Sequence, residues 1–388
     1  MRSFRILIVL TTLLGIAALA SPARAATTTK HVAVCKRAPH GRVGCFAIRV
    51  DRYSAGRIHH TSAPAGYTPA DLRAAYELPA KGGTGTIAIV DAYDDPTAEQ
   101  DLAVYRRQFH LPACTSANGC FRKVDQSGGR GFPAADGGWA QEISLDLDMA
   151  SAVCGGCRLL LVEATSSAQA NLGAAVNTAV RLGADAVSNS YGGPDASDRS
   201  YGRYYHHAGV AITASSGDSG YGVSYPASSR YVTAVGGTTL NRAGGSRRGW
   251  TETAWSGSGS GCSTLNRAPW QKSATTGCEG RAMGDVAAVA DPATGVAVYD
   301  SFAFENTSGW LTFGGTSAAS PIVAAVFALA GNTADVSDGS YVWTHHSRGV
   351  HDVTRGSTGS CPTARWCQAR RGWDGPTGWG TPSGLHAF

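Results

Sequence analysis

The chain has 388 residues, which is enough for one large domain or two ordinary ones. Only 16% of the residues are charged and 50 are glycine, which is typical of a compact, loop-rich protein and argues against disorder. The net charge of +5 is small and the lysines and arginines are scattered, so the sequence shows no surface for binding nucleic acid.

The first residues have the pattern of a secretory signal peptide. Arg2 and Arg5 precede an apolar run at 6–20, and Ala23-Arg24-Ala25 offers a cleavage site of small residues. This pattern predicts a signal peptide over residues 1–25 that is removed after Ala25. No later apolar stretch is long enough to span a bilayer. We therefore expect a secreted, extracellular protein that does not bind membranes.

The ten cysteines agree with an oxidising compartment. The Cys154-Gly-Gly-Cys157 motif is either a redox motif or a structural staple, and an exported chain favours the staple. The even count and the absence of clustered histidines argue against a zinc site. The spacing predicts five local disulfides: Cys35/Cys45, Cys114/Cys120, Cys154/Cys157, Cys262/Cys278 and Cys361/Cys367.

After the signal peptide the chain divides into a short N-terminal extension, 26–66, and a main domain, 67–388. Residues 26–62 are polar, basic and turn-rich, and we expect them to be dispensable for turnover. The main domain opens with a capped helix in which Thr68 is the cap and Pro69 is the first helical residue.

Strand and helix patterns alternate along the main domain. Such alternation predicts an α/β fold with a mostly parallel sheet and helices on both faces. In this architecture, sites form at the carboxyl ends of strands. The predicted strands are 85–90, 159–162, 186–190 and 210–214, the predicted helices are 97–109, 168–182 and 197–207, and the candidate site loops are 188–193, 215–220 and 314–321.

The last of these loops contains a candidate nucleophile. Gly314-Gly315-Thr316-Ser317 leads into an apolar run at 321–330, which predicts a tight loop opening a buried helix with Ser317 near its N-terminus. Free backbone N–H groups and the positive end of the helix dipole gather there. Ser317 is then either a nucleophile beside an anion site or an ordinary helix cap.

A serine nucleophile needs a base, which is most familiar as histidine. Gly217-Asp218-Ser219-Gly220 matches the serine motif of chymotrypsin-like proteases only superficially, because no Ala-Ala-His-Cys-like segment precedes it. Gly315-Thr316-Ser317-Ala318 matches subtilisin-like proteases, and Asp91 follows a strand where their acid lies. However, none of the eleven histidines is followed by Gly-Thr, so the sequence shows no histidine base.

Two carboxylates offer an alternative base. Glu142 and Asp146 lie four residues apart in the segment 139–150, where apolar residues alternate as in a strand. On a strand the two side chains would be roughly 13 Å apart. On a helix their Cβ atoms would lie within about 6 Å of each other. Only the helix makes a coupled acid pair, and a solvated acidic face is the other interpretation.

The order of these motifs resembles the sedolisins, the serine-carboxyl peptidases, which have a subtilisin-like three-layer α/β fold. The chain has Glu-x-x-x-Asp, then Ser-Gly-Asp-Ser-Gly, then Gly-Thr-Ser-Ala, and the resemblance covers about residues 67–388. It implies that Ser317 is the nucleophile, Glu142 its general base and Asp146 the partner that shares the proton. It also implies that Asp218 donates a hydrogen bond to the oxyanion.

A further resemblance at the C-terminus implies one structural calcium ion. Asp352 and Asp374 would supply carboxylates, and Val353, Arg370 and Gly372 would supply backbone carbonyls. Calcium takes about six to eight oxygen ligands of these kinds. The other interpretation is a turn-rich loop capped by the two aspartates.

The sequence therefore predicts a secreted, monomeric serine-type endopeptidase that acts on peptide or protein substrates through an acyl-enzyme, best at acidic pH. Two alternatives stay open. One is a catalytically silent binding protein on the same fold, and the other is a subtilisin-like protease with an unrecognised histidine base.

Overall fold

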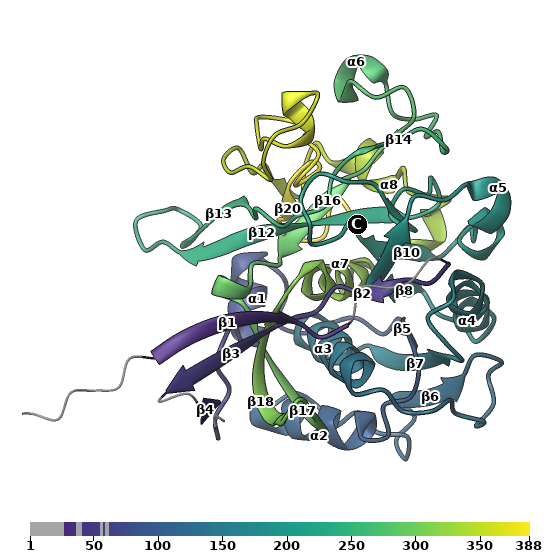
Figure 1. Cartoon of the computed structure of the whole chain (residues 1–388), viewed down its shortest axis with the longest axis vertical. Coiled ribbons are helices and arrows are strands. Elements are labelled where there is room, and N and C mark those ends of the chain that lie inside the picture. Colours follow the sequence, from purple (N-terminus) through teal and green to yellow (C-terminus); the bar gives the residue numbers. More distant parts are fainter. Residues whose placement is uncertain (1–26, 36–40, 55–56, 59–61) are drawn as a thin grey trace, which may run out of the picture.

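The computed structural model describes residues 27–35, 41–54, 57–58 and 62–388, so the predicted signal peptide lies outside the described residues. The core is an eight-stranded sheet in the order β13-β12-β10-β8-β5-β7-β6, with β16 also paired to β12 (Figure 1). Every pairing in it is parallel except that of β12 with β13. Its strands are β5 (Thr86–Ala92), β6 (Phe121–Asp125), β7 (Arg158–Ala164), β8 (Ala186–Asn189), β10 (Ala211–Ser215), β12 (Thr233–Arg242), β13 (Trp250–Ala254) and β16 (Val286–Val289).

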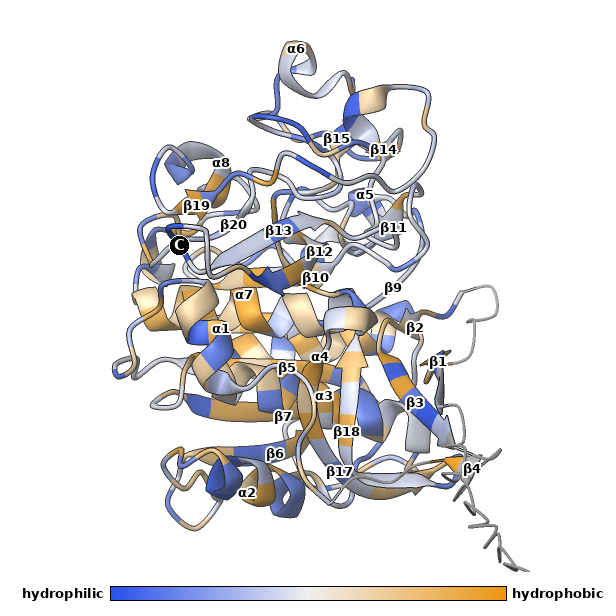
Figure 2. Cartoon of the chain, turned by 90° about the vertical axis from the view of Figure 1, so that its left-hand side faces the viewer, coloured by the Kyte–Doolittle hydropathy of each residue, from blue (hydrophilic) through white to orange (hydrophobic). Residues whose placement is uncertain are grey.

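Helices cover both faces of this sheet, which confirms the predicted α/β architecture. Helices α3 (Gly137–Val153) and α7 (Thr316–Ala330) pack on one face, and α4 (Gln169–Arg181) packs on the other (Figure 1). Figure 2 shows α7 and β5 in apolar colours at the centre of the molecule. The remaining α-helices are α1 (Pro69–Ala75), α2 (Ala98–Gln108), α5 (Asp198–Tyr201), α6 (Ser273–Thr276) and α8 (Tyr341–His345).

The predicted helix at 197–207 is only the four-residue α5 followed by a 3-10 turn over Gly202–Tyr204. Gly202 interrupts it, because glycine is a weak helix former. None of the helices in the described part of the chain is both long and apolar enough to cross a bilayer.

The ambiguous segment around Glu142 is the helix α3. Asp136 caps it, since its side chain accepts hydrogen bonds from the backbone N–H groups of Gly138 and Trp139. Every residue from Gly138 to Val153 is buried. A helix surrounded by protein needs no amphipathic period. The strand-like alternation of its apolar residues is therefore compatible with a helix. Because they are four residues apart, Glu142 and Asp146 lie on the same face of this helix.

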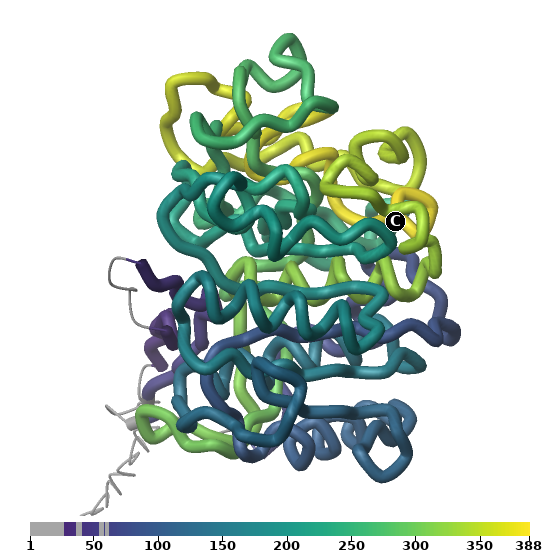
Figure 3. The backbone as a smooth tube through the Cα atoms, turned by 90° about the vertical axis from the view of Figure 1, so that its right-hand side faces the viewer, coloured from purple at the N-terminus to yellow at the C-terminus, as the bar shows by residue number. Residues whose placement is uncertain are grey.

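The N-terminal extension forms strands rather than turns. β1 (Thr27–Ala33) pairs with β3 (Ile48–Ser54), and β3 joins β18 (Thr307–Gly314) in a second sheet that also contains β17 (Val296–Phe304) and β4 (Arg57–Ile58). Figure 3 shows this purple segment along one side of the body. Arg49 of β3 is buried and donates to Asp51 and Gln141, so the extension is packed into the fold.

Three small sheets complete the fold. Their strands are β2 (Gly44–Cys45) with β9 (Tyr191–Pro194) and β11 (Ser224–Tyr225), β14 (Cys262–Ser263) with β15 (Arg281–Ala282), and β19 (Val350–His351) with β20 (Thr381–Pro382).

All five predicted disulfides are confirmed, and they leave no free cysteine in the chain. Cys154 and Cys157 are wholly buried where α3 ends, which fits a staple and not a redox motif.

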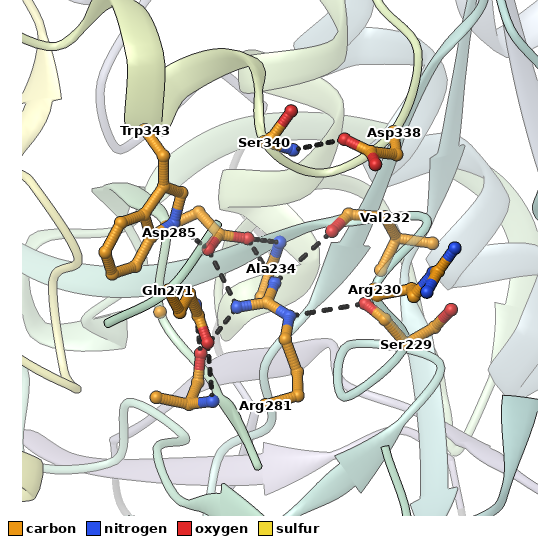
Figure 4. Close-up of polar contacts among 12 residues, drawn as sticks. Ser229, Arg230, Val232, Ala234, Gln271, Arg281, Asp285, Asp338, Ser340 and Trp343 are labelled. Carbon is orange, nitrogen blue, oxygen red and sulfur yellow. Dashed lines mark hydrogen bonds and ion pairs between the residues drawn. The ribbon is translucent and has the colours of Figure 1, made fainter. Parts of the chain in front are cut away.

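A buried ion pair joins the C-terminal half of the chain (Figure 4). The guanidinium of Arg281 donates to both carboxylate oxygens of Asp285, and both side chains are wholly buried. The same carboxylate accepts hydrogen bonds from Trp343 Nε1 and from the backbone N–H of Ala234, each at 2.6 Å. The guanidinium also donates to the carbonyl of Val232. This network connects β12, β15 and α8 through one fully compensated pair of charges.

We expect Arg281→Met to lower the free energy of unfolding by about 3–5 kcal/mol, because it leaves the Asp285 carboxylate buried without its cation. Chemical denaturation of the purified variants measures the change. Arg242→Met is the matched control, since Arg242 pairs with Asp71 at the exposed surface and should contribute about 0–1 kcal/mol. Equal stabilities of the two variants would contradict the role given to Arg281.

Candidate active site

Ser317 is the second residue of α7, as predicted. The chain leaves β18 at Gly314 and turns through Gly315, whose φ of 93° is a conformation that favours glycine. The Ser317 side chain is wholly buried. Its Oγ donates to the carbonyl of Ser190 at 3.0 Å and accepts a hydrogen bond from the backbone N–H of Phe46 at 3.1 Å.

Pro321 affects the position of the nucleophile. It lies inside α7 and has no N–H, so the carbonyl of Ser317 lacks the usual bond from the residue four places later. The hydroxyl of Ser190 lies 3.4 Å from this carbonyl and 2.6 Å from Asp146 Oδ2. Ser190 therefore connects the start of α7 to the acidic residues of α3.

Glu142 and Asp146 face Ser317 from α3 and are wholly buried. Burial raises the pKa of Glu142 well above its usual range, the nearby charge of Asp91 raises it further, and the nearby Ser317 hydroxyl opposes the rise. Burial also raises the pKa of Asp146, with added contributions from Asp91 and Glu142. Oε2 of Glu142 accepts a hydrogen bond from the backbone N–H of Ala47 at 2.9 Å. Like charges this close favour a pair that keeps a proton.

Asp91 adds a third carboxyl group to the pair. It lies near the carboxyl end of β5, is wholly buried, and within the described part of the chain has no hydrogen-bond partner on either oxygen. Burial raises its pKa to about 8. From sequence, Asp91 matches only the acid position of subtilisin-like proteases. Its position at the carboxyl end of a buried strand is the sequence feature that marks it as a candidate site residue, because sites form at such strand ends.

Asp218 lies beside the N-terminus of α7. Its Oδ1 accepts hydrogen bonds from the backbone N–H and the hydroxyl of Thr316, each at 2.8 Å. Its Oδ2 is buried without a hydrogen-bond partner among the residues that the structure describes. Burial raises the pKa of Asp218 to about 7, and the bonds from Thr316 oppose that rise. Below that pH the carboxyl carries a proton, which Oδ2 can donate to an oxygen in front of Gly315.

The structure thus brings Ser317, Glu142, Asp146 and Asp218 into one buried site, and it places the predicted calcium ligands elsewhere, in the C-terminal loops. There the backbone N–H of Gly372 donates to Asp352 Oδ2, and that of Arg370 donates to Asp374 Oδ2, each at 2.9 Å. Burial, with a smaller contribution from the charge of Asp352, raises the pKa of Asp374 to about 7, and the hydrogen bonds from Arg370 and Thr377 oppose that rise.

Two neighbouring carboxylates with like charges fit a cation chemically. Within the described ranges no group of three or more His, Cys, Asp or Glu side chains forms a metal site. A calcium ion in this loop would therefore need backbone carbonyls for the rest of its ligands.

Comparison with known proteins identifies relatives of the chain. The model of the subtilase family matches residues 138–380. Kumamolisin from Bacillus sp. (strain MN-32) is 33% identical over 368 residues, which cover 84% of this chain and 63% of kumamolisin. Sedolisin from Pseudomonas sp. (strain 101) is 30% identical over 388 residues, which cover 86% of this chain and 62% of sedolisin. The chain thus spans somewhat less than two thirds of the length of these curated relatives.

A solved structure supports the same relationship. It is described as Pseudomonas sedolisin (serine-carboxyl proteinase) complexed with two molecules of pseudo-iodotyrostatin. It superposes with a TM-score of 0.68 at 27% identity and covers 83% of this chain and 96% of that chain. These findings confirm the resemblance drawn from the motifs, and the chain belongs to the subtilase family as a homologue of the sedolisins.

Proposed function

We propose that the chain is a serine peptidase that hydrolyses peptide bonds through an acyl-enzyme on Ser317, with the Glu142/Asp146 pair as its base. The observation that carries this proposal is the burial of Ser317, Glu142 and Asp146 in one site, where among the described residues Oε1 of Glu142 and Oδ2 of Asp218 have no hydrogen-bond partner. The relatives support it, since the solved sedolisin is described as a serine-carboxyl proteinase.

The geometry suggests a role for each group. Ser317 Oγ attacks the carbonyl carbon of the substrate while its proton passes to the Glu142 carboxylate, which Asp146 holds in place. The negative oxygen that forms accepts hydrogen bonds from protonated Asp218 and from the Ser317 backbone N–H, which the start of the helix leaves free. Glu142 then gives its proton to the leaving amine. Water hydrolyses the acyl-enzyme and restores the Ser317 hydroxyl.

The same groups imply activity at acidic pH. The base works while Glu142 is ionised and the carboxyl pair retains one proton. Asp218 donates only while protonated, and its pKa is about 7. Rising pH removes that proton and places a negative charge beside the developing oxyanion. We therefore expect activity to peak at roughly pH 3–5 and to fall towards neutrality.

We also propose that the protein is secreted and monomeric and acts on peptides or proteins without binding nucleic acid or membranes. The five disulfides support an oxidising compartment. In addition, we propose one structural calcium ion held by Asp352 and Asp374 and by the carbonyls of Val353, Arg370 and Gly372. The ion would stabilise the C-terminal loops and would take no part in the chemistry.

Glu142→Gln keeps the shape of the side chain and removes the base, so we expect turnover to fall by about a thousandfold or more with little loss of stability. Hydrolysis of an internally quenched peptide between pH 3 and pH 9 measures turnover, and thermal melting measures stability. Glu279→Gln changes an exposed carboxyl and is the control. A near wild-type rate in Glu142→Gln, or a maximum at neutral or alkaline pH, would point instead to a histidine base.

The buried carboxyl groups make stability depend on pH. Burial raises the pKa of Asp91 to about 8, of Asp218 to about 7 and of Asp300 to about 8, against an ordinary value of 3.8. The folded protein therefore keeps protons that the unfolded chain releases as the pH rises above about 4, so stability is full below that pH and falls towards pH 8. We expect the melting temperature of Ser317→Ala, which cannot digest itself, to fall by at least about 5 °C between pH 4 and pH 8. Asp300→Asn should reduce this fall, and a melting temperature that rises with pH would contradict it.

Removal of calcium should lower the melting temperature. A ligand that binds only the folded state at a hundred times its Kd adds about 2.7 kcal/mol, which excess chelator removes. The Asp374→Ala variant should melt at the same lowered temperature, and chelator should not lower its melting temperature further. Asp335→Ala, at an exposed aspartate outside the proposed ligand set, is the control. Identical melting curves with and without chelator, in protein shown by elemental analysis to hold no metal, would refute the site.

A further inference from the structure

The carboxyl group of Asp218 is held by Thr316, the residue before the nucleophile. Oδ1 of Asp218 accepts two hydrogen bonds from this one residue, from its backbone N–H and from its hydroxyl, each at 2.8 Å. The hydroxyl of Thr316, which is wholly buried, also accepts a hydrogen bond from the backbone N–H of Gly217 at 3.2 Å. Because that N–H occupies one lone pair of the hydroxyl oxygen, the hydroxyl hydrogen is left to point at Asp218.

The second oxygen of this carboxyl group, Oδ2, has different surroundings. It is buried and has no hydrogen-bond partner within the part of the chain that the structure describes. A Cβ atom added to Gly315 would lie 2.7 Å from it, so Oδ2 lies against the turn that leads into α7. A proton on Oδ1 would face the N–H and the O–H that already point at that oxygen. The two bonds from Thr316 therefore leave the acid proton of Asp218 on Oδ2.

Few charges act on Asp218. Glu142 of α3 is the titratable group whose pKa responds to the charge of Asp218. Among the described residues, Asp218 forms no salt bridge with a lysine, arginine or histidine. Burial raises the pKa of Asp218 to about 7, and the two bonds from Thr316 are the influences that oppose this rise. Each of these bonds stabilises the ionised carboxylate, so the loss of either one favours the protonated form.

We propose that Thr316 is a positioning residue that acts through Asp218: its hydroxyl keeps the acid proton on the oxygen that faces the substrate carbonyl, and it sets the highest pH at which the peptidase works. This inference rests on the proposed function, in which protonated Asp218 donates to the oxyanion. The hydroxyl has two opposite effects. It orients the donor, which favours turnover, and it stabilises the ionised carboxylate, which ends activity at a lower pH.

These opposite effects distinguish positioning from a merely structural role. A variant that lacks the hydroxyl should turn over more slowly at its optimum and yet stay active to a higher pH. Looser packing of the turn would instead admit water, which lowers the pKa of a buried carboxyl towards its ordinary value. The loss of activity would then begin at a lower pH. The direction in which the alkaline limit moves, defined as the pH at which kcat falls to half on the alkaline side, therefore decides between the two roles.

Thr316→Val removes the hydroxyl and keeps the branched shape of the side chain. An internally quenched peptide gives kcat and KM between pH 3 and pH 9. We expect kcat at pH 4 to fall about tenfold, with KM changed by less than about twofold, because the oxyanion donor is no longer oriented. The alkaline limit should rise by about one pH unit. Thr316→Ser retains the hydroxyl and should restore both values, and Thr316→Ala, whose smaller side chain cannot strain the turn, should shift the limit in the same direction as Thr316→Val.

Thr213→Val is the matched control. Thr213 lies on β10, is wholly buried, and its hydroxyl lies 2.9 Å from the hydroxyl and 3.2 Å from the carbonyl of Ser320 in α7. The same substitution at this position removes a buried hydroxyl next to α7 without removing a bond to Asp218. It should leave the alkaline limit unchanged.

Asp218→Asn separates a failure of this inference from a failure of the proposed function. Asparagine does not titrate, so this variant should lose the alkaline limit, and adding Thr316→Val should then have no further effect on the pH profile. If Asp218→Asn abolishes the limit while Thr316→Val leaves it in place or lowers it, the role of Thr316 is wrong and the proposed function stands. An equal rise in Thr213→Val would also overturn the role of Thr316. An alkaline limit that is unchanged in Asp218→Asn would overturn the part that the proposed function gives to Asp218.

Discussion

The contact between α3 and α7 is the constraint on which the site depends. It buries Glu142 and Asp146, together with Asp91 from β5, beside Ser317. None of these three carboxyls forms a salt bridge within the described residues, and Asp91 has no hydrogen bond there on either oxygen. A buried carboxyl without a cation keeps its proton rather than bear the cost of an uncompensated charge. The packing that makes the core therefore also prepares the chemistry.

The same molecule contains the opposite arrangement. Asp285 is as deeply buried as Asp146, yet it contacts the guanidinium of Arg281 and two N–H groups. Such a carboxylate is matched by charge and hydrogen bonds and has no capacity left for a reaction. The proposed catalytic carboxyls lack such a cation and some of these hydrogen bonds, and a group that must gain and lose a proton needs an incomplete set of partners.

Local patterns in the sequence predicted much of the fold and of the site. The position of Ser317 follows from a glycine pair before an apolar run, and the five disulfides follow from cysteine spacing. The sequence does not decide whether α3 is a helix or a strand, because a helix that is buried on all sides shows no amphipathic repeat of apolar residues. The strand β3 was missed, although its alternating residues Ile48-Arg49-Val50-Asp51 carry the signal. The place of Phe46 beside Ser317 depends on the pairing of β2 with β9, which joins segments far apart in the chain.

The proline inside α7 has a consequence for how the site responds to a ligand. Because Pro321 leaves the Ser317 carbonyl without its helical partner, the first turn of α7 is held partly by Ser190, a residue at the edge where β9 pairs with β2. The carbonyl of Ser190 lies within hydrogen-bonding distance of both the backbone N–H of Phe46 and Ser317 Oγ. Its hydroxyl meanwhile contacts Asp146. A peptide that paired with this edge would contact a residue that also contacts Ser317 and Asp146, so binding at the edge would be coupled to the alignment of the proposed catalytic groups.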